Sequence, residues 1–347
     1  MPISVIYCAA SLLVGAALLG FAGRAEAADY PAPVPLKDGA QADTKVLKTG
    51  DKITIAYMPP ATEFNYYIAI GEGIKSAAAK AGAQTFMLAP QSGTDINGQM
   101  GMIQDAITRN VSAIILSTHD EAAAAPLVKK AVDKGIAVII VNSDIAAFPT
   151  PIHGVVGYSQ RKGTHKLGDY FLSKLEGKPA TIAVIEGLPG YHSTERVGGF
   201  LDAVKGKPGI TIKASIPGGW NVEGGNTAAV DLLQANKDVN VVFAANDYMI
   251  MGAALAAKSL ARPGLTLLGN DGDTAALEEI QAGTVTATVN TTPFVMGEIA
   301  LQVTLDALKG KFPGGFVETP TQIVDKENVT PFLKAADKLY PKPSKSY

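Results

Sequence analysis

The stretch Val241–Gly272, VVFAANDYMIMGAALAAKSLARPGLTLLGNDG, decides the fold class of this chain. It opens with a short apolar run that stops at Asn246-Asp247, which is typical of a strand buried on both faces with polar groups in its exit turn. A segment rich in Ala, Leu and Met follows, and Arg262-Pro263-Gly264 ends it before a second apolar run that stops at Asn270-Asp271-Gly272. The stretch therefore predicts one βαβ unit whose two strands both finish in an Asn-Asp pair.

The same unit occurs a second time, 127 positions earlier in the chain. Ile114–Asp120 (IILSTHD) corresponds to Val241–Asp247, and Val138–Asp144 (VIIVNSD) corresponds to Leu265–Asp271, without a gap. Further upstream the register still holds, from about Lys52 against Pro179. Because strands and helices alternate with short connections, we predict an α/β fold of two similar, doubly wound parallel-sheet domains. Ligands bind at the carboxyl ends of such strands, where the polar pairs lie.

The second half of the chain is predicted to return to the first, so that three segments link the two domains. The crossings are expected near residues 156–158, 290–292 and 318–320. Three linking strands form a hinge, and this geometry leaves a cleft between two facing rows of strand ends. The predicted lobes comprise residues 51–156 with 291–319 at the N-terminal side, and residues 157–290 with 320–347 at the C-terminal side.

The first 27 residues resemble an export signal. Ile3–Ala22 is almost wholly apolar and is followed by Ala25-Glu26-Ala27, an A-x-A cleavage pattern, so we predict cleavage after Ala27 and a periplasmic location. No Lys or Arg precedes the apolar run, and an uncleaved membrane anchor is the alternative. Residues 28–50 contain prolines at the alternate positions 31, 33 and 35, which predict an extended, Pro-rich leader.

Composition and missing motifs exclude several function classes. The net charge of −2 and the lack of a basic run argue against a nucleic-acid partner. Cys8, the only cysteine, precedes the predicted cleavage site, which excludes cysteine nucleophiles and thiolate metal sites in the mature chain. The sequence contains no H-E-x-x-H, P-loop, G-x-S-x-G or CxxC pattern. We therefore expect a protein that is not an enzyme and uses no cofactor or metal. No later segment offers about 20 consecutive apolar residues, so we also expect it to be soluble, and a monomer is expected.

Four motifs carry a family resemblance over about residues 52–324: Phe64-Asn65-Tyr66-Tyr67, Ser193-Thr194-Glu195-Arg196 followed by Gly199-Phe200, Ala245-Asn246-Asp247, and Gly269-Asn270-Asp271-Gly272. The order and spacing of these motifs resemble those of the periplasmic ligand-binding proteins of sugar-uptake ABC transporters, in the ribose/galactose-binding class. The resemblance implies the type I periplasmic binding protein fold, a small polar ligand such as a monosaccharide or polyol, and an ABC transporter membrane permease as partner.

The resemblance also implies where the ligand binds. Flat aromatic rings stack on the apolar faces of a sugar, while Arg, Asn and Asp side chains hydrogen-bond its hydroxyls in fixed directions. No catalytic residue is expected. The predicted ligand-binding residues are Phe64, Tyr66, Tyr67, His119, Asp144, Arg196, Trp220, Asn246, Asn270 and Asp271.

Two departures from the family pattern bear on the ligand. Ser143-Asp144 stands where ribose-binding members have Asp-Arg, and Asn270 stands where they have an aromatic residue. We therefore expect a pocket that is more acidic and less aromatic than the standard one. Such a pocket suits a polyol, a differently configured sugar or an amine-bearing ligand better than ribose.

Purely structural roles are the alternative for several of these residues. Tyr66 and Tyr67 can pack on a loop from the first turn of their helix, Trp220 can anchor a surface loop, and Arg196 can point to solvent. Asp120 and Asp247 each precede a helical stretch and are predicted N-caps. Of the histidines, two are possible ligand donors and two are expected to be structural or exposed: His119 and His192, and His153 and His165, respectively.

Three other functions remain as alternatives. A periplasmic sensor with the same fold would present its ligand state to a chemoreceptor or a histidine kinase. A transcriptional regulator with the same core would carry a helix-turn-helix where this chain has its export signal and leader. A glycoside hydrolase would use Asp144 and Asp271 as paired carboxylates, but no candidate acid lies in an evident apolar setting.

Overall fold

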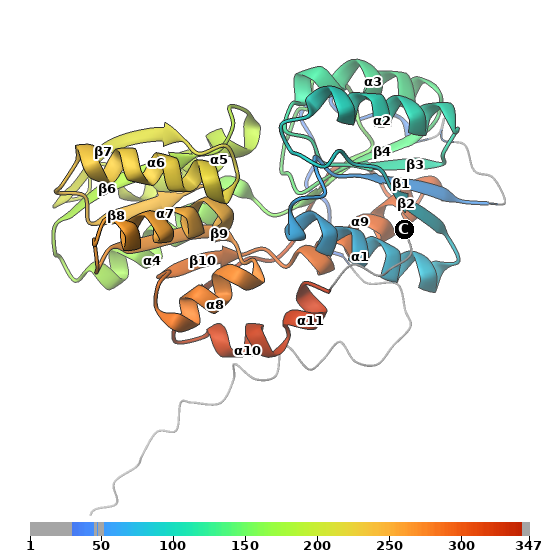
Figure 1. Ribbon diagram of the computed structural model, residues 1–347. Helices are drawn as coiled ribbons and strands as arrows, with labels where there is room; N and C mark the ends of the chain where they lie inside the picture. The colour runs from blue at the N-terminus through green and yellow to red at the C-terminus, as the bar shows by residue number, and fades with distance from the viewer. Residues whose placement is uncertain (1–29, 45–46, 48–51, 342–347) are drawn as a thin grey trace, which may run out of the picture.

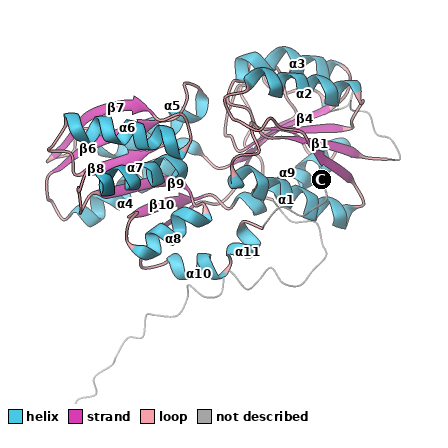
Figure 2. Cartoon of the chain, in the orientation of Figure 1, coloured by secondary structure: helices cyan, strands magenta, loops and turns pink. Residues whose placement is uncertain are grey.

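The computed structural model describes residues 30–44, 47 and 52–341. They form two lobes that lie side by side, each a parallel-dominated sheet covered by helices (Figures 1 and 2). The predicted signal peptide and part of the predicted leader fall outside the described residues. The two α/β lobes confirm the fold class predicted from the repeat.

The N-terminal lobe is built on a six-stranded sheet in the order β11-β5-β4-β3-β1-β2. Helices α2 and α3 lie above this sheet and α1 and α9 lie below it (Figure 1). Its elements are β1 (Thr54–Met58), α1 (Asn65–Ala81), β2 (Gln84–Met87), α2 (Ile96–Thr108), β3 (Ala113–Leu116), α3 (Glu121–Asp133), β4 (Ala137–Val141), β5 (Gly154–Gly157), α9 (Pro293–Leu308) and β11 (Phe316–Glu318).

The C-terminal lobe repeats this design with the sheet order β12-β10-β9-β8-β6-β7. Helix α6 packs on α7 and α4 on α5, and the edge strand β12 pairs antiparallel with β10. Its elements are α4 (Gln160–Leu175), β6 (Ala180–Glu186), α5 (Tyr191–Val204), β7 (Ile210–Pro217), α6 (Val222–Ala235), β8 (Val241–Ala244), α7 (Asp247–Ser259), β9 (Thr266–Asp271), α8 (Thr274–Ala282), β10 (Ala287–Asn290), β12 (Gln322–Asp325), α10 (Val329–Lys334) and α11 (Ala336–Leu339).

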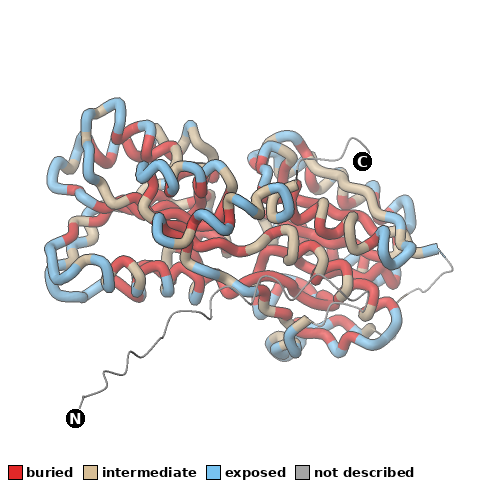
Figure 3. The backbone as a smooth tube through the Cα atoms, turned by 90° about the horizontal axis from the view of Figure 1, so that it is seen from below, coloured by how far each residue is buried: buried red, intermediate tan, exposed pale blue. Residues whose placement is uncertain are grey.

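The central strands are short apolar runs because helices cover both of their faces. Every residue of β3, β4, β5 and β8 is buried, and buried residues concentrate in the interior of both lobes (Figure 3). The chain passes between the sheets after β5, after β10 and after β11, through residues 158–159, 291–292 and 319–321. The carboxyl ends of β4 and β9 therefore face one another across the space between the lobes.

The described part of the leader lies against the N-terminal lobe. Val34 exchanges two backbone hydrogen bonds of 2.7 Å with Phe316 of β11, and the Gln41 side chain donates to the His153 carbonyl oxygen at 2.9 Å. The leader thus covers the edge strand β11, whose backbone groups would otherwise be free to pair with another chain.

The N-cap prediction is correct for Asp120 and wrong for Asp247. Asp120 caps α3 by accepting a hydrogen bond from the Ala123 backbone N–H at 2.8 Å. Helix α7 begins one position earlier relative to the repeat, and its N-cap is Asn246, which accepts from the Met249 backbone N–H at 2.9 Å. The Asp247 carboxylate lies inside the lobe instead.

Helices α1 and α9 approach closely enough that their contact requires glycine. An added Cβ at Gly73 would lie 2.0 Å from the Phe294 carbonyl oxygen, and one at Gly297 would lie 2.1 Å from the Ile70 carbonyl oxygen. We expect Gly73→Ala and Gly297→Ala each to lower the free energy of unfolding by about 1–3 kcal/mol, the usual cost of overpacking. Thermal and denaturant unfolding of the purified variants measure this.

Gly101→Ala is the matched control, because Gly101 lies in helix α2 and its added Cβ would meet no atom within 4 Å. Alanine restricts the unfolded chain and favours the helix, so this variant should gain up to about 1 kcal/mol. Equal stability of all three variants would contradict the close approach of α1 and α9.

Candidate ligand-binding site between the lobes

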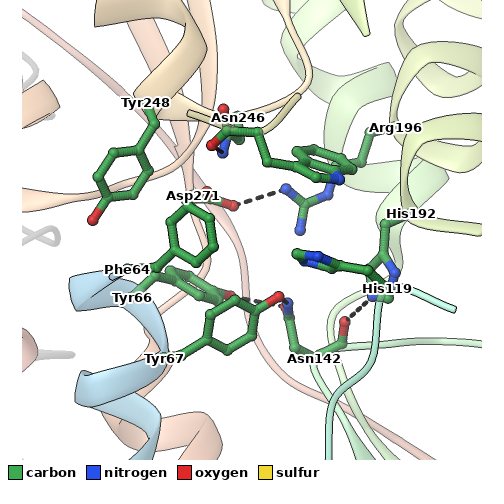
Figure 4. Close-up of a pocket in the computed structure, with 11 residues that line it drawn as sticks. Phe64, Tyr66, Tyr67, His119, Asn142, His192, Arg196, Asn246, Tyr248 and Asp271 are labelled. Atoms are coloured by element: carbon green, nitrogen blue, oxygen red, sulfur yellow. Dashed lines mark hydrogen bonds and ion pairs between the residues drawn. The ribbon is translucent and has the colours of Figure 1, made fainter. Parts of the chain in front are cut away.

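A cavity lies between the lobes, and side chains from both lobes line it (Figure 4). The space at this lining, counted together with the part open to solvent, is about 370 Å³. Eight of the ten predicted ligand-binding residues lie on its surface. The lining residues are Phe64, Tyr66, Tyr67, His119, Asn142, His192, Arg196, Trp220, Asn246, Tyr248 and Asp271.

A buried ion pair forms the polar side of the cavity. Arg196 comes from α5 and Asp271 ends β9, and the Arg196 Nη1–H donates to Asp271 Oδ1 at 2.9 Å. Arg196 also donates from Nε to Gln160 Oε1 at 2.6 Å and from Nη1 to the Ala245 carbonyl oxygen at 3.1 Å. The side chains of the ion pair are only 4% and 6% exposed. The pair therefore presents charges that hydrogen bonds hold in fixed positions.

The protonation states of this pair follow from burial and proximity. Burial raises the pKa of Asp271, because the charged form loses hydration, and the nearby Arg196 guanidinium opposes that rise. Neighbouring phenols and the Asp271 carboxyl raise the pKa of Arg196 against the opposing effect of burial, so the guanidinium stays charged. Asp271 Oδ1 accepts a second hydrogen bond from Asn270 Nδ2 at 3.0 Å. The carboxylate keeps lone pairs for a ligand hydroxyl.

Aromatic rings form most of the remaining surface. The Arg196 guanidinium carbon lies 5.5 Å from the Trp220 ring centre, and Trp220 stacks on His119 with their centroids 6.1 Å apart. From the other lobe, Phe64 meets Tyr248 edge to face at 5.4 Å. These rings offer flat apolar faces against which a sugar ring can stack.

The first turn of α1 supplies Tyr66 and Tyr67, whose hydroxyls meet Asn142 at the end of β4. The Tyr66 hydroxyl donates to Asn142 Oδ1 at 3.0 Å, and Asn142 Nδ2 donates to the Tyr67 hydroxyl at 3.4 Å. Both phenols are buried, and burial raises the pKa of each above its usual value. They remain neutral, so Tyr67 retains a proton to donate.

The two histidines of the cavity are neutral. Burial lowers the pKa of His119 to about 4 and that of His192 to about 3. Carbonyl oxygens fix their orientation, because His119 Nδ1 lies 3.2 Å from the Gly93 oxygen and His192 Nε2 lies 2.8 Å from the Asn142 oxygen. His119 therefore keeps Nε2 as a hydrogen-bond acceptor, whereas His192 Nδ1 lies 3.7 Å from Glu121 Oε1.

Asp144 and Asn270 do not line the cavity, although both were predicted to bind the ligand. Asp144 accepts hydrogen bonds from the Tyr191 hydroxyl at 3.0 Å and from the Gln160 backbone N–H at 3.2 Å, and so joins the two lobes beside the site. Asn270 is fully buried and donates to Asp271 and, at 2.8 Å, to the Tyr158 hydroxyl. Both residues hold groups around the site instead of facing it.

The sequence prediction omitted three lining residues: Asn142, His192 and Tyr248. For His192 the sequence predicts only a possible hydrogen-bond donor to the ligand. Asn142 follows directly on the apolar run of β4, as Asn246 follows β8, so the strand-end rule could have found it. Tyr248 lies in the first turn of α7, and the sequence gives no sign that its ring faces the other lobe.

The expected acidic, aromatic-poor pocket is not what the structure has. Asp271 is the one carboxylate among the lining residues, and Arg196 neutralises it. Five lining side chains are Phe, Tyr or Trp. Tyr248 lies outside the four motifs of the family resemblance and adds an aromatic ring to the site.

Within the described ranges, no group of three or more His, Cys, Asp or Glu side chains is placed to hold a metal ion. Over the same residues, no helix has the length and apolar character needed to cross a membrane. The cavity is suited to noncovalent recognition through stacking and hydrogen bonds.

Comparison with known proteins agrees with this architecture. A family model described as "Periplasmic binding protein domain" matches residues 55–312. The D-ribose/D-allose-binding protein of Pseudomonas aeruginosa is 30% identical over 292 residues, which are 80% of this chain and 90% of that protein. The D-allose-binding periplasmic protein of Escherichia coli is 28% identical over 70% of this chain and 81% of its own length.

Solved structures show the same fold. A periplasmic solute-binding protein of an ABC transporter from Actinobacillus succinogenes, with bound D-allose, superposes with a TM-score of 0.75 at 26% identity over 81% of this chain and 100% of its own. A solute-binding protein from Mycobacterium smegmatis with bound glycerol gives a TM-score of 0.75 at 27% identity over 81% and 97% of the two chains. The fold and the cavity define a two-lobed binding protein. The chain belongs to the periplasmic binding protein family, and its fold is type I.

Proposed function

We propose that this protein captures a small polyhydroxylated ligand, a monosaccharide or a polyol, between its lobes and delivers it to the membrane permease of an ABC transporter. The observation that carries the proposal is the cavity itself, in which the Arg196–Asp271 pair faces the rings of the other lobe. The names of the relatives from Pseudomonas aeruginosa and Escherichia coli support a sugar as ligand. Since Arg196 neutralises Asp271, the lining offers no spare carboxylate that would favour an amine-bearing ligand.

We propose further that the lobes close on the ligand by rotation about the three linking segments. Hydrogen bonds between the lobes support the closed arrangement as one end of this motion. The Asn65 backbone N–H donates to the Tyr248 hydroxyl at 3.0 Å, and His192 donates to the Asn142 carbonyl oxygen at 2.8 Å. A ligand that touches both lobes stabilises this closed arrangement over an open one.

The proposed location is the periplasm, after cleavage of the chain behind Ala27. The family's description as periplasmic supports export, and the cleavage site itself lies outside the described residues. Mass spectrometry of the protein purified from a periplasmic extract gives the mature N-terminus, which we expect to be Ala28.

The ligand is tested with a thermal-shift screen of pentoses, hexoses and polyols. A ligand present at about 100 times its dissociation constant stabilises the folded protein by about 2.7 kcal/mol. Trp220 is the only tryptophan of the chain and lines the cavity. Its fluorescence should therefore change as a true ligand binds, with the same midpoint as a calorimetric titration.

Trp220→Phe is the control for the optical signal. This variant should lose the fluorescence response and keep measurable binding by calorimetry, because phenylalanine preserves a flat ring. If no sugar or polyol shifts the unfolding temperature of the intact protein, the proposed ligand class is wrong.

A further inference from the structure

The family model matches the chain only up to residue 312. The chain continues past this point and past β12. We call residues 326–340 the C-terminal brace. Its first helix, α10, packs on α8 of the C-terminal lobe, and its second helix, α11, packs on α9 of the N-terminal lobe. In Figure 1 the brace runs along the lower side of the molecule, from below α8 toward α1 and α9. It thus contacts both lobes beside the linking segments.

The beginning of the brace is fixed to the C-terminal lobe. Asp325 accepts a hydrogen bond from the Tyr170 hydroxyl at 2.9 Å. Asn328 donates from Nδ2 to the Ile323 carbonyl oxygen and accepts at Oδ1 from the Asp325 backbone N–H, both at 3.0 Å. Val329 and Phe332 are buried against this lobe's helices. This end of the brace therefore moves with the C-terminal lobe.

The far end of the brace reaches the back of the ligand cavity. Leu339 and Tyr340 pack against the core cluster that also contains Tyr66 and Tyr67. The Tyr340 hydroxyl donates to the Asp271 carbonyl oxygen at 3.3 Å. Burial raises the pKa of Tyr340 well above its usual value, so the phenol stays neutral and able to donate.

The carbonyl that Tyr340 holds belongs to a strained residue. Asp271 has φ 133°, a region that residues other than glycine rarely adopt. Thr291, in a linking segment, donates to the same oxygen from its backbone N–H at 3.1 Å and from its hydroxyl at 3.2 Å. Tyr340 and Thr291 together fix the backbone that aims the Asp271 carboxylate at the cavity and at Arg196.

We propose that the C-terminal brace holds the two lobes near the closed angle and that Tyr340 is a positioning residue for Asp271. Only Ala335 separates α10 from α11, so the connection between the two helices is too short to extend far. Opening the lobes must detach either α11 from α9 or Tyr340 from Asp271. The brace therefore raises the population of the closed state before ligand binds.

Apparent affinity rises with that population, because less free energy is needed for closure. The effect on affinity rests on the proposed function, whereas the effect on the lobe angle does not.

Small-angle X-ray scattering without ligand tests the brace directly. A chain that ends at Asn328 is compared with a control chain that ends at Pro341, which keeps the whole brace. We expect the shorter chain to be more extended, with a larger radius of gyration, while its far-ultraviolet circular dichroism stays that of a folded α/β protein. Superimposable scattering curves would overturn the proposal. This measurement needs no ligand, so its result is independent of whether a sugar binds.

Point variants separate the brace from simple loss of stability if the shortened chain does not fold. Tyr340→Phe removes only the hydroxyl, Leu339→Ala loosens α11, and Lys338→Ala, at an exposed position of α11, is the control. With the ligand found in the screen, we expect Tyr340→Phe and Leu339→Ala to bind at least about threefold more weakly than the control. The change should appear as faster dissociation in stopped-flow measurements of Trp220 fluorescence. Affinity equal to that of Lys338→Ala would show that Tyr340 does not position Asp271.

Discussion

Arg196→Ala is expected to weaken ligand binding by tenfold or more and also to destabilise the C-terminal lobe. A tenfold loss corresponds to about 1.4 kcal/mol, and the guanidinium makes its hydrogen bonds inside a closed site, where an unpaired partner is costly. The substitution leaves the buried Asp271 carboxylate without its cation, and breaking a buried pair from one side typically costs about 3–5 kcal/mol. Calorimetric titration and denaturant unfolding measure the two effects separately.

The double variant Arg196→Ala/Asp271→Ala distinguishes binding from stability. Removing both charges relieves the unpaired carboxylate, so the double variant should be more stable than Arg196→Ala alone while binding remains weak. Arg196→Lys is a second comparison. It keeps the positive charge but cannot reach Gln160, the Ala245 carbonyl oxygen and Asp271 together. If Arg196→Ala retains both full affinity and full stability, the site described between the lobes is not the binding site.

Asp247→Ala is expected to lower the free energy of unfolding by about 3 kcal/mol or more. Asp247 is fully buried, and its Oδ2 accepts from the backbone N–H groups of Gly272 at 2.7 Å and Asp273 at 2.8 Å, while Oδ1 accepts from the Thr288 hydroxyl at 2.6 Å. Each buried donor left without a partner costs about 1–3 kcal/mol. Because the Gly272–Asp273 turn follows Asp271 directly, ligand affinity should fall as well. Chemical denaturation and calorimetry give the two values.

The corresponding residue of the other lobe provides the control. Asp120 stands 127 positions earlier, where it caps α3 and is partly exposed. Asp120→Ala removes one N-cap hydrogen bond and should cost only about 1 kcal/mol. Similar losses in the two variants would contradict the distinct roles that the structure gives them.

Much of the fold could be predicted from the sequence because the physical pattern is strong and occurs twice. Apolar runs such as Val241–Ala244 are too short for helices of a globular core, and each ends in polar residues that start a helix. The strand-end rule brought Asn246 and Asp271 to one edge, and the family resemblance added Arg196. The structure places these three on the cavity. Ligand contact by these residues remains a prediction.

The rest of the site depended on turn geometry that a linear pattern does not specify. After β4 the chain turns through Asn142 with φ 61°, and this turn directs Asn142, not Asp144, into the cavity. Asp144 accepts a hydrogen bond from Tyr191, which lies in the other lobe and comes near only when the two lobes are assembled. In the same way, the start of α7 is shifted by one residue relative to α3, so that equivalent aspartates differ in burial.

The linking segments also set the order in which the lobes are completed during synthesis. The N-terminal lobe receives α9 and β11 from residues 293–318, after the whole C-terminal sheet except β12 has been made. Until then the face of α1 that carries Gly73 has no helix to pack on. We therefore expect the lobe that emerges first from the ribosome to be among the last parts to complete its packing. Contacts so distant in sequence form slowly, so we expect completion of the N-terminal lobe to limit the folding rate.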